Sequence, residues 1–424
     1  MSGILVKLSG WSRSWKFWVV LHILLFLGLL TVLALLLYPG PGSMERAVAL
    51  KILDGQIPYH DFPSEYPPLA LLSFLAPGLL FSTHIPYCLA FAVEILLFDL
   101  AAMFLISLVA SHLKISRRRA LTVYTLSILA IGPLITIRYD MLPAVLVLGA
   151  LTSFVLGKNK LAWGALALGF SAKLYPLIIA PLFILYHLRH RQYRQLVTGG
   201  FTFLAILLLL TLPWLIIDAP GFWQSLTYHM ERGLQTESSY ATILLVGQAL
   251  GLTEVTGEFS FGSWNLVSPL ADSLAKASFF ISAGFLAVLY SLFGWLLWRK
   301  PKPAAVKAPA VPESSALILG YSLLAVTVFL LTSKVLSPQF LIWLCPLLPL
   351  LKGRFNYIPW FLFLTAGALT QYVFPYNYIA LELGETHPVA IMAARNCLLA
   401  IMAVLTIIFS FRPQAKPGQP ATSY

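Results

Sequence analysis

Long apolar stretches separated by short polar segments make up almost the whole chain. About 20 apolar residues in a helix cross a hydrocarbon core roughly 30 Å thick, and such stretches recur along the sequence. We therefore predict an all-α polytopic membrane protein with about 12 transmembrane helices. The predicted spans are at approximately residues 17–38, 86–110, 120–137, 141–157, 161–174, 176–188, 197–217, 275–298, 315–334, 339–351, 356–374 and 389–411.

The composition excludes a water-soluble fold. Hydrophobic residues are 59% of the chain, charged residues are 10%, and the mean hydropathy is +0.84. The formal net charge of +12 would suit a nucleic-acid partner, but the basic residues stand in short runs between apolar stretches, as topology signals do. The cysteines, Cys88, Cys345 and Cys397, fall inside apolar stretches, which argues against a disulfide framework.

The distribution of Lys and Arg predicts the orientation in the membrane. Cytoplasmic loops carry an excess of basic residues, so we expect a multi-pass protein of the cytoplasmic membrane with both termini in the cytoplasm. The polar motifs then gather on the extracytoplasmic side. The apolar run at 17–38 is too long for a signal-peptide core and is expected to be a retained first span. The basic runs lie at the two termini and at 114–119, 158–160, 189–194, 299–307 and 352–354.

The apolar stretch at residues 67–82 breaks this alternation. A full crossing there would place Arg117, Arg118 and Arg119 on the outer side. We therefore expect a re-entrant or interfacial helix after the first extracytoplasmic loop, with a thirteenth span as the alternative.

We expect a single transmembrane domain over residues 1–411. A linker rich in Pro, Ala and Lys separates two blocks of helices, and the tail is expected to be disordered. The expected parts are an N-terminal block at 1–298 with a catalytic loop at 39–67 and an outer loop at 218–274, a cytoplasmic linker at 299–314, C-terminal helices at 315–411, and the tail at 412–424.

Two helical hairpins are too short for a full crossing. The residues between Lys160 and Arg189 must go out and back, which gives each arm roughly 20 Å. Lys173 at the turn should then lie below the outer surface, where a charge must line a cavity or be paired. The arm after Pro338 is similarly short, so Gln339 should also lie below the outer surface. A cavity open to the outer side is therefore expected.

Carboxylates cluster in and just before the proline-rich segment at 54–69. Proline holds this segment extended. Asp61, Glu65 and the upstream Glu45 could act as a general base on an attacking hydroxyl or bind a divalent metal, although no ligand spacing supports a metal site. In the simpler interpretation they are solvated loop charges, and Asp54 caps the turn.

Aromatic residues accompany these acids. Tyr59, Phe62 and Tyr66 could stack on a sugar ring or contact a prenyl chain. Tyrosines are also enriched at membrane interfaces without any such role. Both interpretations stay open.

Lys173, followed by Tyr175, is the preferred cation for a buried phosphate, because a phosphate would stabilise its charge. The alternative is an ion pair with Glu94 or Asp99, since acids at membrane depth need a partner.

Arg138 and Asp140 form a second charged motif. They could contact substrate, or they could pair locally while Asp140 caps the helix that begins at Met141.

Further polar residues on the expected outer side are His229, Arg232 and Gln339. Arg395, inside the last span, could contact a phosphate or extend outward to the interface. The sequence contains no glycine-rich phosphate loop, Asp-x-Asp motif or zinc spacing. We therefore expect no metal or other cofactor, and soluble nucleotide substrates are disfavoured.

Several motifs, taken together, resemble those of the GT-C integral-membrane glycosyltransferases, and most closely the glycosyltransferase 87 branch. This branch includes polyprenol-phosphate-mannose-dependent mannosyltransferases. The resemblance covers most of the chain, from about residue 17 to residue 411. The motifs are GQIPYHDF at 55–62, EYPPL at 65–69, RYDMLP at 138–143, AKLYP at 172–176 and SPQFLIW at 337–343.

The resemblance implies transfer of a sugar, such as mannose or another hexose, from a polyprenyl-phosphate donor to a lipid or glycan hydroxyl on the outer face. A carboxylate in the first outer loop would be the base. The resemblance places an Asp near positions 41–43, whereas this chain has Pro41, Gly42 and Ser43. Glu45, Asp61 or Glu65 would then take that role.

Two other functions compete with this one. A lipid-linked sugar transporter would also need an amphipathic cavity, but its polar residues should line the full membrane depth. An oligosaccharide ligase should carry a larger outer loop rich in Arg and His.

Overall fold

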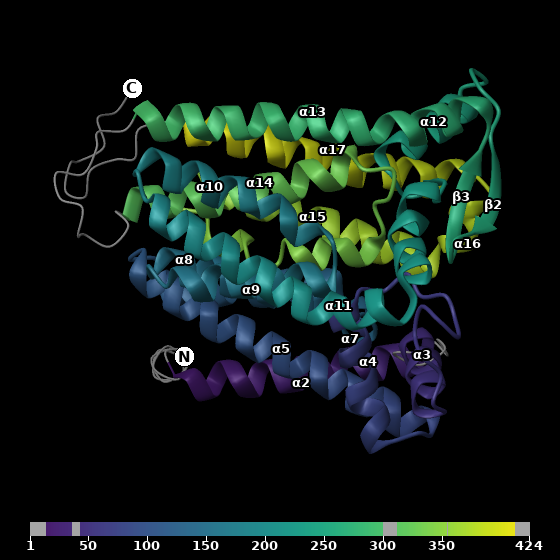
Figure 1. Cartoon of the computed structure of the whole chain (residues 1–424). Helices are drawn as coiled ribbons and strands as arrows, with labels where there is room; N and C mark the ends of the chain where they lie inside the picture. The colour runs from purple at the N-terminus through teal and green to yellow at the C-terminus, as the bar shows by residue number, and fades with distance from the viewer. Residues whose placement is uncertain (1–13, 36–42, 300–311, 354, 412–424) are drawn as a thin grey trace, which may run out of the picture.

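The computed structural model describes residues 14–35, 43–299, 312–353 and 355–411 (Figure 1). Of these described residues, 79% are helical. Positions 36–42, most of the predicted linker and the tail after residue 411 lie outside the described residues. The α-helices before the first strand are α2 (Trp15–Leu35), α3 (Ser43–Leu53), α4 (Pro68–Leu80), α5 (His84–His112), α6 (Arg117–Ile131), α7 (Leu134–Ile137), α8 (Met141–Val155), α9 (Asn159–Ala172), α10 (Ala180–Arg189) and α11 (Tyr193–Glu231).

The second half of the chain is also mainly helical. Short 3-10 segments precede α10 and follow α14, and a π-helical turn follows α15. These elements are η1 (Tyr175–Ile179), α12 (Ser239–Ala249), α13 (Pro269–Arg299), α14 (Pro312–Thr332), η2 (Pro338–Trp343), η3 (Leu348–Leu350), α15 (Tyr357–Gln371), η4 (Tyr372–Tyr376), α16 (Tyr378–Glu382) and α17 (Thr386–Ser410).

Within the described residues, seven helices are long and apolar enough to cross a membrane. They include α2, α5, α11, α13 and α17, and each of the seven overlaps a stretch predicted as a span. Other predicted spans form shorter helices such as α8, or the 3-10 segments η2 and η3. The total of 12 crossings stays a prediction, as does the re-entrant or interfacial placement of α4, whose 13 residues form a helix.

The helices break where the sequence disfavours continuation. Gly132, with φ of +67°, follows the end of α6, and Pro133 begins the short turn to α7. Asp218 has extended backbone angles inside α11, two residues before Pro220. Because Pro220 has no N–H to donate to the preceding turn and its ring crowds that turn, α11 bends at this point.

The prediction of an all-α chain was wrong between residues 218 and 274. Instead of one outer loop, this segment contains the end of α11, α12 and a three-stranded antiparallel sheet in the order β1-β3-β2. The strands are β1 (Leu234–Gln235), β2 (Thr256–Ser260) and β3 (Ser263–Val267). Because β2 is exposed almost throughout, it lacks the alternation of apolar and polar residues that reveals a half-buried strand.

Figure 1 shows the long helices running side by side, with the sheet, α12 and α16 at one end of the bundle. The main core includes buried side chains of α5, α6, α8, α9, α10 and α14. A smaller core that includes Leu234, Leu266 and Met392 joins the sheet to α12 and α17.

The outer surface of the bundle is apolar. In α11, for example, Phe201, Leu209 and Ile216 are at least 70% exposed. Such a surface is unfavourable in water and suits a hydrocarbon environment. The chain is therefore a multi-pass membrane protein.

Candidate active site

The segment after α3 is held in place by its aromatic side chains. Tyr59 is 4% exposed, its ring packs edge-on against Trp214 and Phe222, and its hydroxyl donates to the carbonyl of Tyr66. The Tyr66 ring contacts Phe74 at a centroid distance of 4.8 Å. Tyr59 and Tyr66 therefore pack as parts of the protein interior.

Asp61 lies in an open groove whose lining does not include Glu45 or Glu65. Its side chain is 42% exposed and its Oδ2 accepts a hydrogen bond from the Ile57 amide at 2.6 Å. His60, beside it, contacts Asp218 Oδ2 at 3.1 Å. The groove is lined by Tyr59, His60, Asp61, Phe62, Pro63, Asp218, Pro220, Gly221 and Gln224.

Glu45 is buried at 2% exposure on the first turn of α3, so the loop predicted at 39–67 is a helix at this position. Burial raises the pKa of its carboxyl, while the nearby positive charges of Arg138 and, more weakly, Lys173 act in the opposite direction. A carboxylate whose pKa is raised toward neutrality is a stronger general base. Glu45 thus shares one charged environment with Arg138, Asp140 and Lys173.

Lys173 is fixed by one carboxylate and three aromatic rings. Its ammonium lies 2.5 Å from Asp140 Oδ1 and 4.6, 4.8 and 5.2 Å from the ring centroids of Tyr139, Phe340 and Trp343. Each ring face attracts a cation. The extended backbone of Lys173 ends α9, so the side chain leaves the helix at the turn before η1.

Asp140 also accepts a hydrogen bond from Trp343 Nε1 at 2.7 Å. The Trp343 ring stacks on Tyr175 with centroids 3.8 Å apart and on Phe340 with centroids 4.3 Å apart. Asp140 makes no side-chain hydrogen bond to the first turn of α8, so the predicted helix cap is wrong. Its carboxylate orients Lys173 instead.

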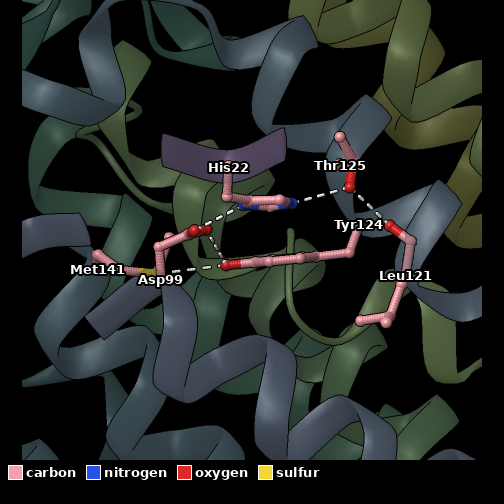
Figure 2. Close-up of polar contacts among 6 residues, drawn as sticks. All are labelled: His22, Asp99, Leu121, Tyr124, Thr125 and Met141. Carbon is pink, nitrogen blue, oxygen red and sulfur yellow. Dashed lines mark hydrogen bonds and ion pairs between the residues drawn. The ribbon is translucent and has the colours of Figure 1, made fainter. Parts of the chain in front are cut away.

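The alternative pairing of Lys173 with Asp99 is also wrong. Figure 2 shows Asp99 between His22 and Tyr124. His22 Nδ1 lies 2.6 Å from Asp99 Oδ2, and the Tyr124 hydroxyl donates to Asp99 Oδ1 at 2.7 Å. Glu94, the other proposed partner, accepts a hydrogen bond from Ser73.

The chain of Asp99, His22 and Thr125 resembles a catalytic triad, but its hydrogen bonds exclude that role. Thr125 donates its hydroxyl proton to the carbonyl of Leu121, so it accepts from His22 Nε2 (Figure 2). An imidazole that donates at Nε2 cannot remove the threonine proton. This network therefore connects α2 to α5 and α6.

The remaining candidates lie where the end of α11 meets this region. His229 Nε2 donates to the carbonyl of Glu65 at 3.1 Å. The Arg232 side chain is half-buried near the Glu65 carboxylate, and its carbonyl accepts from Lys334. Gln339 accepts a hydrogen bond from the Ser337 hydroxyl at 2.6 Å.

The sequence interpretation missed Tyr139, Phe340 and Trp343, although all three belong to the quoted motifs. Their aromatic character was the available signal, but their contact with Lys173 depends on tertiary packing. In the described part of the chain, no group of three or more His, Cys, Asp or Glu residues is arranged to hold a metal ion.

These observations define a class: a polytopic helical membrane protein with a buried cluster of cationic and carboxylate side chains at one end of its bundle. The model of glycosyltransferase family 87 matches residues 65–325. The chain belongs to this family, which confirms the resemblance, and it is a membrane glycosyltransferase.

Comparison with solved structures gives a more distant match. The crystal structure of ArnT from Cupriavidus metallidurans in the apo state has 15% sequence identity to this chain and a TM-score of 0.47. The match covers 93% of this chain and 76% of that one. No curated protein matches the sequence.

Proposed function

We propose that the protein transfers a sugar, mannose or another hexose, from a polyprenyl-phosphate donor to a hydroxyl of a lipid or glycan acceptor. The observation that carries this proposal is the arrangement of Lys173, Arg138 and Glu45 around Asp140. Two cations next to two buried carboxylates, Glu45 and Asp140, suit a reaction with an anionic leaving group and a proton to remove.

Lys173 and Arg138 would hold the donor phosphate. The ammonium of Lys173 is fixed in position by Asp140 and Trp343 before substrate binds. A fixed cation stabilises the growing charge of a leaving phosphate without reorganising during the reaction. Tyr175 supports this arrangement through its stacking on Trp343.

Glu45 is the proposed general base. In an inverting transfer, the acceptor oxygen bonds to the anomeric carbon, the bond from that carbon to the phosphate oxygen breaks, and the acceptor proton passes to Glu45. The polyprenyl phosphate leaves with the bonding electrons. Glu45 is favoured over Asp61 because it shares the environment of Lys173 and Arg138, whereas Asp61 lies in the open groove. Glu65 is the second candidate.

The proposed setting is the extracytoplasmic face of the cytoplasmic membrane, with both termini in the cytoplasm. The distribution of basic residues supports this orientation. His229, Arg232 and Gln339 would line the approach to the site from the same side. We propose that no metal takes part.

Transfer from labelled polyprenyl-phosphate mannose in membranes tests the proposal. Glu45→Gln should reduce transfer by about 100-fold or more, the usual range for loss of a general base. Asp61→Asn should retain transfer within about threefold, since a half-exposed loop charge contributes little. Glu65→Gln, the same change at the second candidate base, is measured for comparison with Glu45→Gln.

Full activity of Glu45→Gln would disprove the assignment of the base. No transfer by the wild type from any of several polyprenyl-phosphate sugars would disprove the donor class.

A further inference from the structure

The first turn of α6 carries three consecutive arginines, Arg117, Arg118 and Arg119. The N-terminal end of a helix is the positive end of its dipole, so cations there are unfavourable unless an anion is present. No Asp or Glu occurs between residues 100 and 139, and among the described residues no ion pair of 4.0 Å or less includes these arginines. The described part of the chain therefore leaves their positive charge without a countercharge.

Two tryptophan rings position the first and the third of these arginines. The Arg117 guanidinium lies 5.2 Å from the ring centroid of Trp15 in α2, and the Arg119 guanidinium lies 5.0 Å from that of Trp360 in α15. Trp360 is itself fixed, because its Nε1 donates to the carbonyl of Leu348 at 3.0 Å. A ring face attracts a cation without neutralising its charge, so both guanidinium groups are held in place and remain positive.

One face of α6 is exposed along the helix from these arginines. Arg118, Thr122, Leu126 and Leu129 are exposed, and their spacing of four, four and three residues places them on one side of a helix. Polarity falls along this face, from a guanidinium through a hydroxyl to two leucines. A phospholipid has the same order of polarity from its headgroup to its acyl chains.

The exposed face of α6 is bordered by α2 and α15. At 100° per residue, Thr125 and Ala130 lie roughly 55° and 85° to either side of the middle of this face. Thr125 accepts a hydrogen bond from His22 of α2 at 2.8 Å (Figure 2). Ala130 packs against Gly367 of α15, where an added Cβ would lie 3.0 Å from the Ala130 side chain. A molecule on this face would therefore lie between α2 and α15.

This arrangement favours a membrane lipid over a soluble anion. A molecule that neutralises Arg118 and also covers Leu126 and Leu129 must be anionic at one end and apolar at the other. Anionic phospholipids have this chemistry, and they are attracted to basic segments at the ends of membrane helices. The basic residues of the turn between α5 and α6 predict that it faces the cytoplasm, so the lipid would belong to the cytoplasmic leaflet.

We propose that the arginine turn of α6 binds an anionic phospholipid of the cytoplasmic leaflet. Arg118 and Arg119 bind its phosphate, whose oxygens match the planar guanidinium groups. The Nε–H of Arg117, which is buried and has no hydrogen-bond partner among the described residues, is a further donor for the headgroup. One acyl chain lies along Leu126 and Leu129. This site shares no residue with the candidate active site, so the proposal does not rest on the proposed function.

Lipid titration followed by native mass spectrometry tests the proposal. The full chain is purified in detergent, and the probes are phosphatidylglycerol and phosphatidylcholine with identical acyl chains. The first headgroup is anionic, whereas the second has no net charge. We expect one phosphatidylglycerol to bind about 25-fold more tightly than phosphatidylcholine, since Arg118 and Arg119 should each contribute about fivefold.

A double variant locates the binding. Arg118→Gln combined with Arg119→Gln should remove most of the preference for phosphatidylglycerol. Both side chains are exposed, so the packing of α6 should not change, and unchanged phosphatidylcholine binding checks that the variant is folded. The matched control is Arg191→Gln combined with Arg194→Gln, the same change at exposed arginines where α10 meets α11. It should alter the preference by less than about twofold, because distant exposed charges are screened.

Equal loss of the preference in the two double variants would overturn the proposal, because a diffuse positive surface would then explain the binding. Equal binding of the two lipids by the wild type would also overturn it. The third probe is glycerol 3-phosphate, which carries a phosphate but no acyl chain, and a large excess of it should leave phosphatidylglycerol bound. Displacement by this probe would assign a soluble-anion site instead of a lipid site. No sugar donor is present, so a failed transfer assay leaves these results intact.

Discussion

At the scale of single residues, Lys173 makes two kinds of contact that respond differently to a bound phosphate. The Asp140 carboxylate competes with a phosphate for the ammonium charge, whereas the rings of Tyr139, Phe340 and Trp343 attract the cation without neutralising it. Trp343 also donates a hydrogen bond to Asp140. This bond stabilises part of the carboxylate's negative charge and so weakens its attraction for the Lys173 ammonium. The indole thus leaves part of the lysine charge available to a ligand.

Trp343→Phe tests this role of the indole. The phenyl ring keeps the stacking on Tyr175 but removes the donor to Asp140, so we expect transfer to fall by about tenfold through a weaker fit of Lys173 to the phosphate. Rates and the KM for the donor provide the measurement. Trp223→Phe, at a tryptophan that is 63% exposed in α11, is the matched control. Equal losses in both variants would contradict the prediction.

Glu45 should make stability depend on pH. Its pKa is raised by burial, so between its unfolded and folded pKa values the native state binds more protons than the unfolded state. The free energy of unfolding therefore falls as pH rises through this window. Glu45→Gln cannot ionise, so it should be more stable than the wild type at pH 7.5 and similar to it at pH 4, while transfer is lost.

Thermal unfolding of the purified protein at both pH values measures this difference. Glu258→Gln, at an exposed carboxylate, keeps Glu45 and should therefore show the same dependence of stability on pH as the wild type. A Glu45→Gln variant less stable than the wild type at pH 7.5 would contradict the prediction.

At the scale of elements, the loop after α3 rests on the bend of α11. A Cβ at Gly221 would lie 1.9 Å from the backbone oxygen of Tyr59, and Asp218 Oδ1 accepts from the Gly221 amide at 2.9 Å. The absence of a side chain at residue 221 therefore lets the loop approach the helix. This contact sets where Tyr59 and Tyr66 lie.

Gly221→Ala should push the loop after α3 away from the bend of α11. The clash is with backbone, which cannot rotate away, so we expect a loss of about 1–3 kcal/mol in the free energy of unfolding. Denaturation in detergent and transfer activity are the measurements. Gly200→Ala in the same helix meets nothing within 4 Å and should be neutral. A neutral Gly221→Ala would show that the loop can shift freely.

Helices were predictable because their apolar runs are long, as for α5, which extends two residues beyond each end of the predicted span at 86–110. The sheet was not predictable, since β2 is exposed and its pairing with β3 depends on a local hairpin. Glu45 was recognised as a candidate, but its burial depends on packing. The contact of Asp140 with Lys173 joins residues 33 positions apart, and neither hydropathy nor spacing encodes that distance.

At the scale of the whole molecule, the candidate site and the sheet lie at one end of the bundle. The turn between α8 and α9 lies at the other end of these helices from Asp140 and Lys173, which are in contact. The basic residues of that turn predict that it faces the cytoplasm, so the site should face the opposite side.

Cysteine labelling tests this orientation. With Cys397, the exposed native cysteine of the described segments, replaced by Ser, a membrane-impermeant maleimide should label Glu258→Cys in intact cells. Lys158→Cys should react only after the membrane is permeabilised, because its turn carries positive charge. Labelling of Lys158→Cys in intact cells would reverse the orientation.

The contact between His22 and Asp99 has a consequence for the first helix. One proton lies between His22 Nδ1 and Asp99 Oδ2, and the pair has zero net charge whichever atom holds it. A membrane potential does work of about 2.3 kcal/mol per elementary charge per 100 mV, but almost none on a neutral pair at one depth. The voltage across the membrane should therefore leave the contact between His22 of α2 and Asp99 of α5 unchanged.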